Sequence, residues 1–263
     1  MLRDMTMTIE ETSAGPVALY SGGAGTRPLV LLHGNGHSIH EFDRIVPLLA
    51  DQYKLLGWDM PGHGASNAAR SNLSIDERAA LLGDMLAGRT QEPAVLVGTS
   101  IGAFIAAALA VQRPNQVAAL LLVEMQVRDR AWWDAAWPLV NRMFGVPRQD
   151  FDAVQARLCS PLDDALLGRW NADREQAGAE SMIAAMEAIR DHDAAATLSA
   201  LTVPTHFLFG EKGPAADCIE AARQCTPHAG CGVIPGAGHF VSIDQPESFA
   251  AAVAGMFRGR GVC

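Results

Sequence analysis

Apolar residues in the first half of the chain fall into two alternating patterns. Short apolar runs predict strands covered on both faces, because such strands lack a polar alternation. These runs occupy residues 17–21, 28–33, 54–58, 94–97 and 117–123. Between them, residues 41–50 space their apolar side chains along one side of a helix, and Ser74 with Glu77 forms the capping box of another. Strands that alternate with helices predict an α/β fold with a mostly parallel central sheet and helices on both faces.

After Glu124 the pattern changes. Residues 125–201 predict helices and loops without a strong strand, and the clearest helical segments are residues 162–170 and 181–189. Strands and a last helix return at residues 204–209, 232–235 and 245–257. A chain of 263 residues is long enough for one α/β domain with an insertion. We therefore expect a core of residues 1–124 and 202–263, with residues 125–201 folded as a helical cap.

Charge and cysteine content narrow the range of partners. The chain has 29 acidic and 20 basic residues and no Lys/Arg cluster, which argues against nucleic acid and anionic membranes and favours a small-molecule partner. The cysteines are odd in number and lack C-x-x-C spacing: Cys159, Cys218, Cys225, Cys231 and Cys263. We expect free thiols in a reducing cytoplasm rather than a zinc site or a disulfide framework. Residues 1–13 lack the apolar segment of a signal peptide.

The most informative stretch follows the apolar run at residues 94–97. Gly98-Thr99-Ser100-Ile101-Gly102 matches G-x-S-x-G, and the Ala-rich residues 103–111 predict a helix directly after it. A strand, a sharp turn and a helix hold the serine hydroxyl exposed above a helix N-terminus, which favours developing negative charge. The uncharged residues 94–111 are long enough for a membrane span. The glycines, Thr and Ser at the centre of this stretch favour a turn instead.

A serine hydroxyl is a weak nucleophile, so it needs a base, and that base needs a carboxylate to orient and stabilise it. Among the eight histidines, His239 has the most suitable position, in a glycine-containing loop between a predicted strand and the last helix. A loop at the carboxyl end of a strand can bring its imidazole to Ser100. His239 is therefore the predicted base.

Four segments, in this order, resemble the α/β-hydrolase family. They are His33-Gly34, the loop at residues 59–66, the G-x-S-x-G turn and Gly238-His239-Phe240. The resemblance implies the α/β-hydrolase fold with a cap, Ser100 as nucleophile and His239 as base. It also implies an oxyanion hole made by the backbone N–H groups of Asn35 and Ile101. Neither a metal ion nor a cofactor is implied.

The carboxylate is the point at which the chain departs from the family. Family members usually carry Asp after the strand that corresponds to residues 204–209, whereas this chain has Gly213 at that place. Glu124, Asp217 and Glu211 are the possible replacements. We prefer Glu124, because certain haloalkane dehalogenases with a similar fold supply their acid from the end of the same strand. Asp217 would need a rearranged loop.

A helical cap over the strand ends would cover the crevice in which such sheets bind ligands. Trp132, Trp133, Trp137 and Phe240 are the candidate pocket residues. The predicted function is a serine hydrolase that cleaves a small carboxylic ester, or a related acyl substrate, through an acyl-enzyme. The same triad would serve a carbon–carbon bond hydrolase or a perhydrolase. The glycine at the usual acid position leaves a third alternative, a non-catalytic relative that binds a small ligand.

Overall fold

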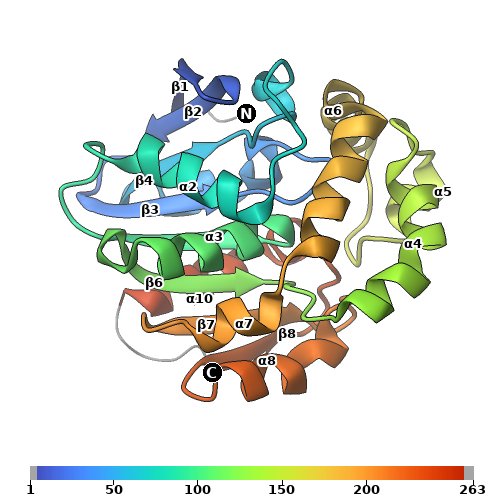
Figure 1. Cartoon of the computed structure of the whole chain (residues 1–263). Coiled ribbons are helices and arrows are strands. Elements are labelled where there is room, and N and C mark those ends of the chain that lie inside the picture. The colour runs from blue at the N-terminus through green and yellow to red at the C-terminus, as the bar shows by residue number, and fades with distance from the viewer. Residues whose placement is uncertain (1–4, 258–263) are drawn as a thin grey trace.

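The computed structural model describes residues 5–257, and their strands form one eight-stranded sheet (Figure 1). The strands are β1 (Met5–Thr12), β2 (Gly15–Gly22), β3 (Arg27–Leu32), β4 (Tyr53–Trp58), β5 (Ala94–Thr99), β6 (Val117–Val123), β7 (Thr205–Gly210) and β8 (Gly230–Ile234). Their order in the sheet is β1-β2-β4-β3-β5-β6-β7-β8. The pairs β1–β2 and β2–β4 are antiparallel, and all further neighbours are parallel. The predicted mostly parallel sheet is confirmed.

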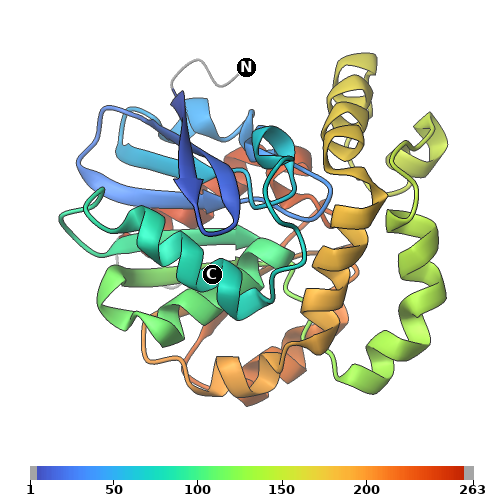
Figure 2. The ribbon, with the colours of Figure 1, turned by 45° about the horizontal axis from the view of Figure 1, so that its top comes forward.

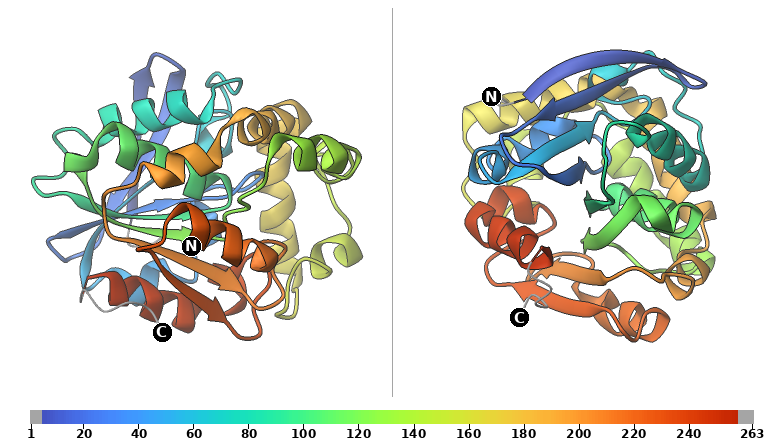
Figure 3. Two further views of the ribbon diagram at one scale, coloured as in Figure 1. Left: turned by 60° about the horizontal axis from the view of Figure 1, so that its bottom comes forward. Right: turned by 90° about the vertical axis from the view of Figure 1, so that its left-hand side faces the viewer.

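Helices cover both faces of this sheet (Figure 3, right). The α-helices are α1 (Val46–Leu49), α2 (Ile75–Leu86), α3 (Ile101–Gln112), α4 (Arg130–Phe144), α5 (Phe151–Gln155), α6 (Asp164–Asp191), α7 (Ala194–Ser199), α8 (Ile219–Cys225), α9 (Val241–Asp244) and α10 (Pro246–Met256). Short 3-10 turns are η1 (Ile39–Phe42), η2 (Gly64–Ser66), η3 (Pro114–Gln116) and η4 (Ala216–Cys218). Helices α2, α3, α7 and α8 share one buried apolar cluster, and α1 and α10 share a second one.

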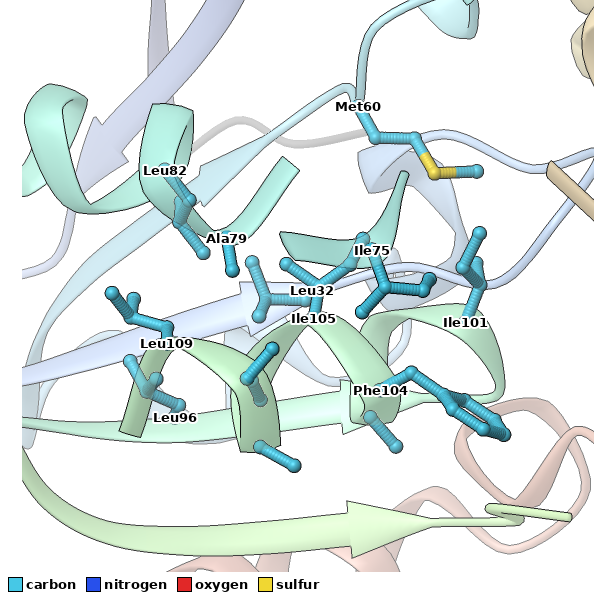
Figure 4. Close-up of a cluster of buried hydrophobic side chains, with 14 of the residues drawn as sticks. Leu32, Met60, Ile75, Ala79, Leu82, Leu96, Ile101, Phe104, Ile105 and Leu109 are labelled. Carbon is cyan, nitrogen blue, oxygen red and sulfur yellow. The ribbon is translucent and has the colours of Figure 1, made fainter. Parts of the chain in front are cut away.

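The helix that follows β5 is enclosed by the rest of the core. Residues 101–110 of α3 are all buried, and the small alanines among them let this helix approach the strands closely. Figure 4 shows apolar side chains of α2 and α3 meeting Leu32 and Leu96 of the sheet. The uncharged stretch 94–111 is therefore a buried strand followed by a buried helix. Among the residues that the structure describes, no helix is long and apolar enough to cross a membrane.

Three helices between β6 and β7 lie beside the carboxyl ends of the parallel strands (Figures 1 and 2). These helices, α4, α5 and α6, fall within the segment predicted to form a cap. Helix α6 is 28 residues long, and the left-handed backbone of Gly178 (φ 73°) kinks it. The two helices expected at residues 162–170 and 181–189 are thus parts of one kinked element. Helix α7, at the end of the same segment, packs against α3 and α8 of the core instead.

Two local predictions differ from the structure. Residues 5–12 form β1, which the apolar pattern did not indicate because this edge strand exposes most of its side chains. The single helix expected over residues 41–50 is divided into η1 and α1. Pro47 explains the division, since it has no N–H to donate to the carbonyl of Asp43, four residues earlier.

Candidate active site

Ser100 lies in a strained turn between β5 and α3. Its backbone angles (φ 53°, ψ −119°) are uncommon for a residue with a side chain. A Cβ on Gly98 would lie 2.2 Å from the Gly102 carbonyl oxygen, and one on Gly102 would lie 2.3 Å from that of Leu32. Both positions therefore require glycine. The Ser100 N–H donates to the Val123 carbonyl at 2.9 Å, which ties the turn to the end of β6.

Glu124 directly follows β6, also with a positive φ (51°), and is completely buried. Its Oε1 accepts a hydrogen bond from the Gly210 N–H at 2.8 Å, and its Oε2 accepts one from the Ala215 N–H at 3.3 Å. The same Oε2 lies 3.1 Å from Nδ1 of His239. Because a carboxylate accepts, Nδ1 of His239 carries the proton and Nε2 is left as the basic nitrogen.

The two other candidate acids lie away from His239. The side chain of Asp217 is 68% exposed and forms an ion pair with Arg128. That guanidinium holds the pKa of Asp217 below its usual value. Glu211 is also exposed, and its Oε2 accepts a hydrogen bond from the Gly236 N–H at 3.0 Å. Of the three carboxylates predicted as alternatives, the structure brings Glu124 to the histidine.

Gly213 occupies the position at which family members usually carry the acid, and it lies next to the Glu124 carboxylate in space. A Cβ at Gly213 would lie 2.2 Å from Oε1 and 2.5 Å from Oε2 of Glu124. The Glu124 carboxylate thus occupies the volume that a side chain at position 213 would need. The two positions exclude each other, and glycine at one accompanies the carboxylate at the other.

Ser100 and His239 line the same cavity, whose volume is about 460 Å³. The His239 side chain is 12% exposed. Within the described range of the chain, no hydrogen bond joins the serine hydroxyl to the imidazole. Such contacts are often long before substrate binds. The predicted nucleophile, carboxylate and base come from the loops after β5, β6 and β8, at the edge of the sheet where parallel strands place their ligands.

The two expected oxyanion donors have different surroundings. Ile101 is the first residue of α3, where backbone N–H groups lack an intrahelical partner. Each polar atom of the Asn35 side chain makes one hydrogen bond: Nδ2 donates to the Met182 carbonyl at 2.8 Å, and Oδ1 accepts from Nε2 of His63 at 3.0 Å. The backbone N–H of Asn35 has no hydrogen-bond partner among residues 5–257. Both N–H groups therefore remain expected donors.

Buried polar side chains brace the loop that contains Asn35. His33 accepts from the Met60 N–H at Nε2 (2.9 Å) and donates from Nδ1 to the Gly34 carbonyl (2.8 Å). Oε2 of Glu41 accepts from the Gly34 N–H at 2.7 Å. Burial raises the pKa of Glu41 to about 7. This carboxyl group therefore changes charge near neutral pH directly behind the expected oxyanion loop.

The cavity wall is mainly apolar and comes from the cap. Of the predicted pocket residues, Trp132 and Trp133 line it. Further apolar walls are Phe104, Ala136, Leu139, Val140, Met143, Phe144, Ala156, Met186, Ile189 and Pro214. The polar lining consists of Ser100, Gln126, Arg157, Lys212 and His239.

Trp137 and Phe240 were predicted to line the pocket, and the structure places them elsewhere. The Trp137 ring faces α6, where the Arg190 guanidinium lies 4.2 Å from its centre. Phe240 packs 4.8 Å from the Trp170 ring and 4.7 Å from the His37 ring. Trp137 thus packs against a cation, and Phe240 packs against other rings. Spacing along the sequence did not reveal these contacts.

Residues 29–252 match the model of the alpha/beta hydrolase family. The chain belongs to this family. It is 30% identical over 250 residues to the pimeloyl-[acyl-carrier protein] methyl ester esterase of Neisseria meningitidis serogroup C. The matched region covers 89% of this chain and 94% of the relative. It is also 30% identical over 258 residues to the 2-succinyl-6-hydroxy-2,4-cyclohexadiene-1-carboxylate synthase of Enterobacter sp. (strain 638), with 91% and 95% covered. The solved structure of a thermophilic esterase from Thermogutta terrifontis has the same fold, with a TM-score of 0.79 and 24% sequence identity. The match covers 98% of this chain and 100% of the esterase chain.

Two charged residues of this α/β-hydrolase were missed by sequence reasoning. Glu41 occupies a polar position in a stretch predicted to be an amphipathic helix, and Arg157 follows a short cap helix in a loop without any motif. Each acquires its place in the site only through long-range packing. No local signal would have identified either one.

The described part of the hydrolase offers no obvious metal site. Among residues 5–257, no group of three or more His, Cys, Asp or Glu side chains could hold a metal ion. Cys159, Cys218, Cys225 and Cys231 are free thiols. The expectations for Cys263 and for residues 1–4 concern positions outside the described range.

Proposed function

We propose that this α/β-hydrolase is a serine esterase that cleaves a small carboxylic ester with Ser100, His239 and Glu124. The observation that carries the proposal is the 3.1 Å contact between Glu124 Oε2 and His239 Nδ1 beside the cavity that Ser100 lines. A serine on a strained turn, a histidine in one tautomer and a buried carboxylate are the groups that acyl transfer requires.

The reaction takes place in two halves. Ser100 Oγ attacks the ester carbonyl while its proton passes to Nε2 of His239, and Glu124 stabilises the resulting imidazolium. The backbone N–H groups of Asn35 and Ile101 stabilise the oxyanion, and such preorganised donors contribute several kcal/mol. His239 then protonates the departing alcohol. Water attacks the acyl-enzyme, gives its proton to His239, and releases the acid while Ser100 regains its hydrogen.

The comparisons favour an ester over the alternatives. A relative of nearly the same length is named a methyl ester esterase, which supports ester cleavage here. Another relative is named a synthase. Carbon–carbon bond cleavage with the same three residues is the second candidate. The contact between Glu124 and His239 supports catalysis over a purely ligand-binding role. We also propose a cytoplasmic location, which free thiols such as Cys159 favour.

Hydrolysis of p-nitrophenyl esters of increasing acyl length tests the proposal, with Ser100→Ala measured beside the wild type. We expect turnover with the wild type and a loss of at least about 10⁴-fold in Ser100→Ala. A fluorophosphonate probe should label the wild type at Ser100 and leave the variant unlabelled. Turnover that survives Ser100→Ala, or a wild type that is neither active nor labelled, would overturn the assignment.

A further inference from the structure

Arg157, a half-buried residue in the wall of the cavity, lacks the acceptors that an enclosed cation ordinarily has. It follows α5 and lines the same cavity as Ser100 and His239. Its guanidinium makes no hydrogen bond or ion pair with any residue in the range 5–257, and its Nη1 atom is buried without a partner. Because burial of an unpaired charge is unfavourable, the pocket contains a positive charge that calls for an anion.

Other arginines of the cap have at least one acceptor for the guanidinium, although Nε of Arg169 and both Nε and Nη1 of Arg174 are also buried without a partner. Arg169 pairs with Asp173 at 2.8 Å. The fully buried Arg174 donates from Nη2 to two backbone carbonyl oxygens, at 2.6 and 2.7 Å. Arg157 has a second cation nearby instead of an anion, and burial together with Arg174 lowers its pKa to about 9. A bound anion would remove this imbalance.

Aromatic rings hold the Arg157 guanidinium and leave its donors available. Its central carbon lies 5.0 Å from the ring centres of both Trp170 and Phe240. A ring contact of this kind takes up none of the N–H groups of a guanidinium in a conventional hydrogen bond, and those groups lie along its edge, in its plane. The two parallel donors at that edge match the two oxygens of a carboxylate, which a single ammonium group cannot do.

The arginine also has a defined position relative to the predicted base. The Phe240 ring lies 4.9 Å from the His239 ring, so Phe240 contacts both side chains. Asp244 joins the two segments of chain, because it accepts hydrogen bonds from the N–H of Cys159, two residues after Arg157, and from the residue before His239. The cation is therefore fixed near the reaction centre.

We propose that Arg157 binds a free carboxylate at the end of the substrate distant from the scissile ester, so that the substrates are monoesters of dicarboxylic acids. This inference rests on the proposed function, since it places the ester at Ser100. The cavity has a volume of about 460 Å³, which is in the range of small-molecule sites. Apolar side chains of α4 and α6 suit the methylene chain between the two ends, among them Leu139, Met143, Phe144 and Met186.

Paired substrates isolate the carboxylate. Mono-p-nitrophenyl esters of adipic acid and longer diacids are compared with the same esters whose free end is a carboxamide. We expect the wild type to favour the carboxylate in kcat/KM, and Arg157→Met to lose about 10- to 100-fold on the charged ester with little change on the neutral one. Arg157→Lys should restore part of the preference. Arg148→Met, at an exposed cap arginine paired with Glu175, serves as the matched control and should behave as wild type.

The possible outcomes separate this inference from the proposed function. Ser100-dependent turnover without a preference for the carboxylate keeps the esterase and overturns the anion site. Equal losses on both substrates in Arg157→Met, with an unchanged melting temperature, also overturn it. A preference that disappears in Lys212→Met rather than in Arg157→Met assigns the anion to the exposed lysine of the cavity instead.

Direct binding provides a readout that does not depend on turnover. Calorimetry of adipate with the Ser100→Ala protein should give an affinity that falls about 10-fold or more when Arg157→Met is added. Hexyl phosphate is titrated beside adipate. Tighter binding of hexyl phosphate than of adipate would contradict a carboxylate site and indicate a phosphate ligand.

Discussion

At the carboxyl edge of the sheet, backbone hydrogen bonds between neighbouring strands hold the reactive side chains, whereas in the cap the packing of long side chains shapes the pocket wall. The Ser100 N–H bonds to the end of β6, and the Glu124 N–H bonds to the Leu208 carbonyl of β7. Helices α4 and α6 meet mainly through apolar and aromatic groups. If the proposed triad is correct, the backbone positions the groups for the chemistry, and side chains of the cap select the substrate.

Loss of the acid should lower the rate more than any change in the cap. In Glu124→Gln the amide can donate towards Nδ1 of His239, which would favour the wrong tautomer. We expect kcat on a p-nitrophenyl ester to fall roughly 10³- to 10⁴-fold with little change in KM. Asp217→Asn and Glu211→Gln are the matched controls and should remain near wild type. A collapse of kcat in either control, with Glu124→Gln active, would reverse the assignment.

The mutual exclusion of Glu124 and Gly213 provides a rescue that sharpens this test. The left-handed backbone at Glu124 accepts glycine, and its removal frees the volume next to position 213. Glu124→Gly should therefore be almost inactive, and the double variant Glu124→Gly/Gly213→Asp should recover a part of kcat. Gly213→Asp alone should be impaired, since the two carboxylates would collide.

A change in the cap should affect selectivity more than rate. Trp133 is buried and lines the cavity, so Trp133→Ala enlarges it. We expect the preferred acyl length to increase and kcat/KM on short esters to fall about 10-fold. Trp137→Ala removes a ring that faces Arg190 rather than the cavity, and it should leave the acyl-length profile unchanged. An altered profile in Trp137→Ala would place that ring in the pocket after all.

The smallest effect on rate, and the clearest effect of pH on stability, is expected at Glu41. Its pKa is about 7 in the folded protein against 4.5 as the ordinary value, so the unfolded chain loses this proton first as pH rises. The free energy of unfolding therefore decreases as pH rises from about 4.5 to about 7. Glu41→Gln removes this contribution. The stability of Glu41→Gln relative to wild type should increase by roughly 1–3 kcal/mol between about pH 5 and about pH 8.

Denaturant unfolding at several pH values measures this difference. A difference between Glu41→Gln and wild type that does not change with pH would contradict the raised pKa of Glu41. Asp173, whose pKa burial raises to about 6, contributes in the same direction to both proteins, and its charge also raises the pKa of Glu41 in the wild type.

The parts of the site that sequence could predict are those encoded over a few neighbouring residues. The turn at Ser100 needs adjacent glycines, and His239 lies in a short loop after a strand. Glu124 was preferred because some proteins with a similar fold supply the acid from the end of the same strand, although the sequence left Asp217 and Glu211 open. Arg157 and the true direction of Trp137 depend on how three cap helices pack together. Side-chain contacts between distant segments decide that packing, and no single-chain periodicity encodes it.

The close approach of Glu124 to Gly213 also bears on how proteins of this fold are classified as active enzymes or inactive relatives. A glycine in the alignment column of the usual aspartate suggests a pseudoenzyme, yet here that glycine makes room for a carboxylate from a neighbouring strand. Because the two side chains need the same volume, an aspartate at position 213 would require a shorter residue at position 124. A protein of this fold should therefore be judged inactive only when no carboxylate lies beside the histidine in space. The absence of aspartate at one sequence position is not sufficient.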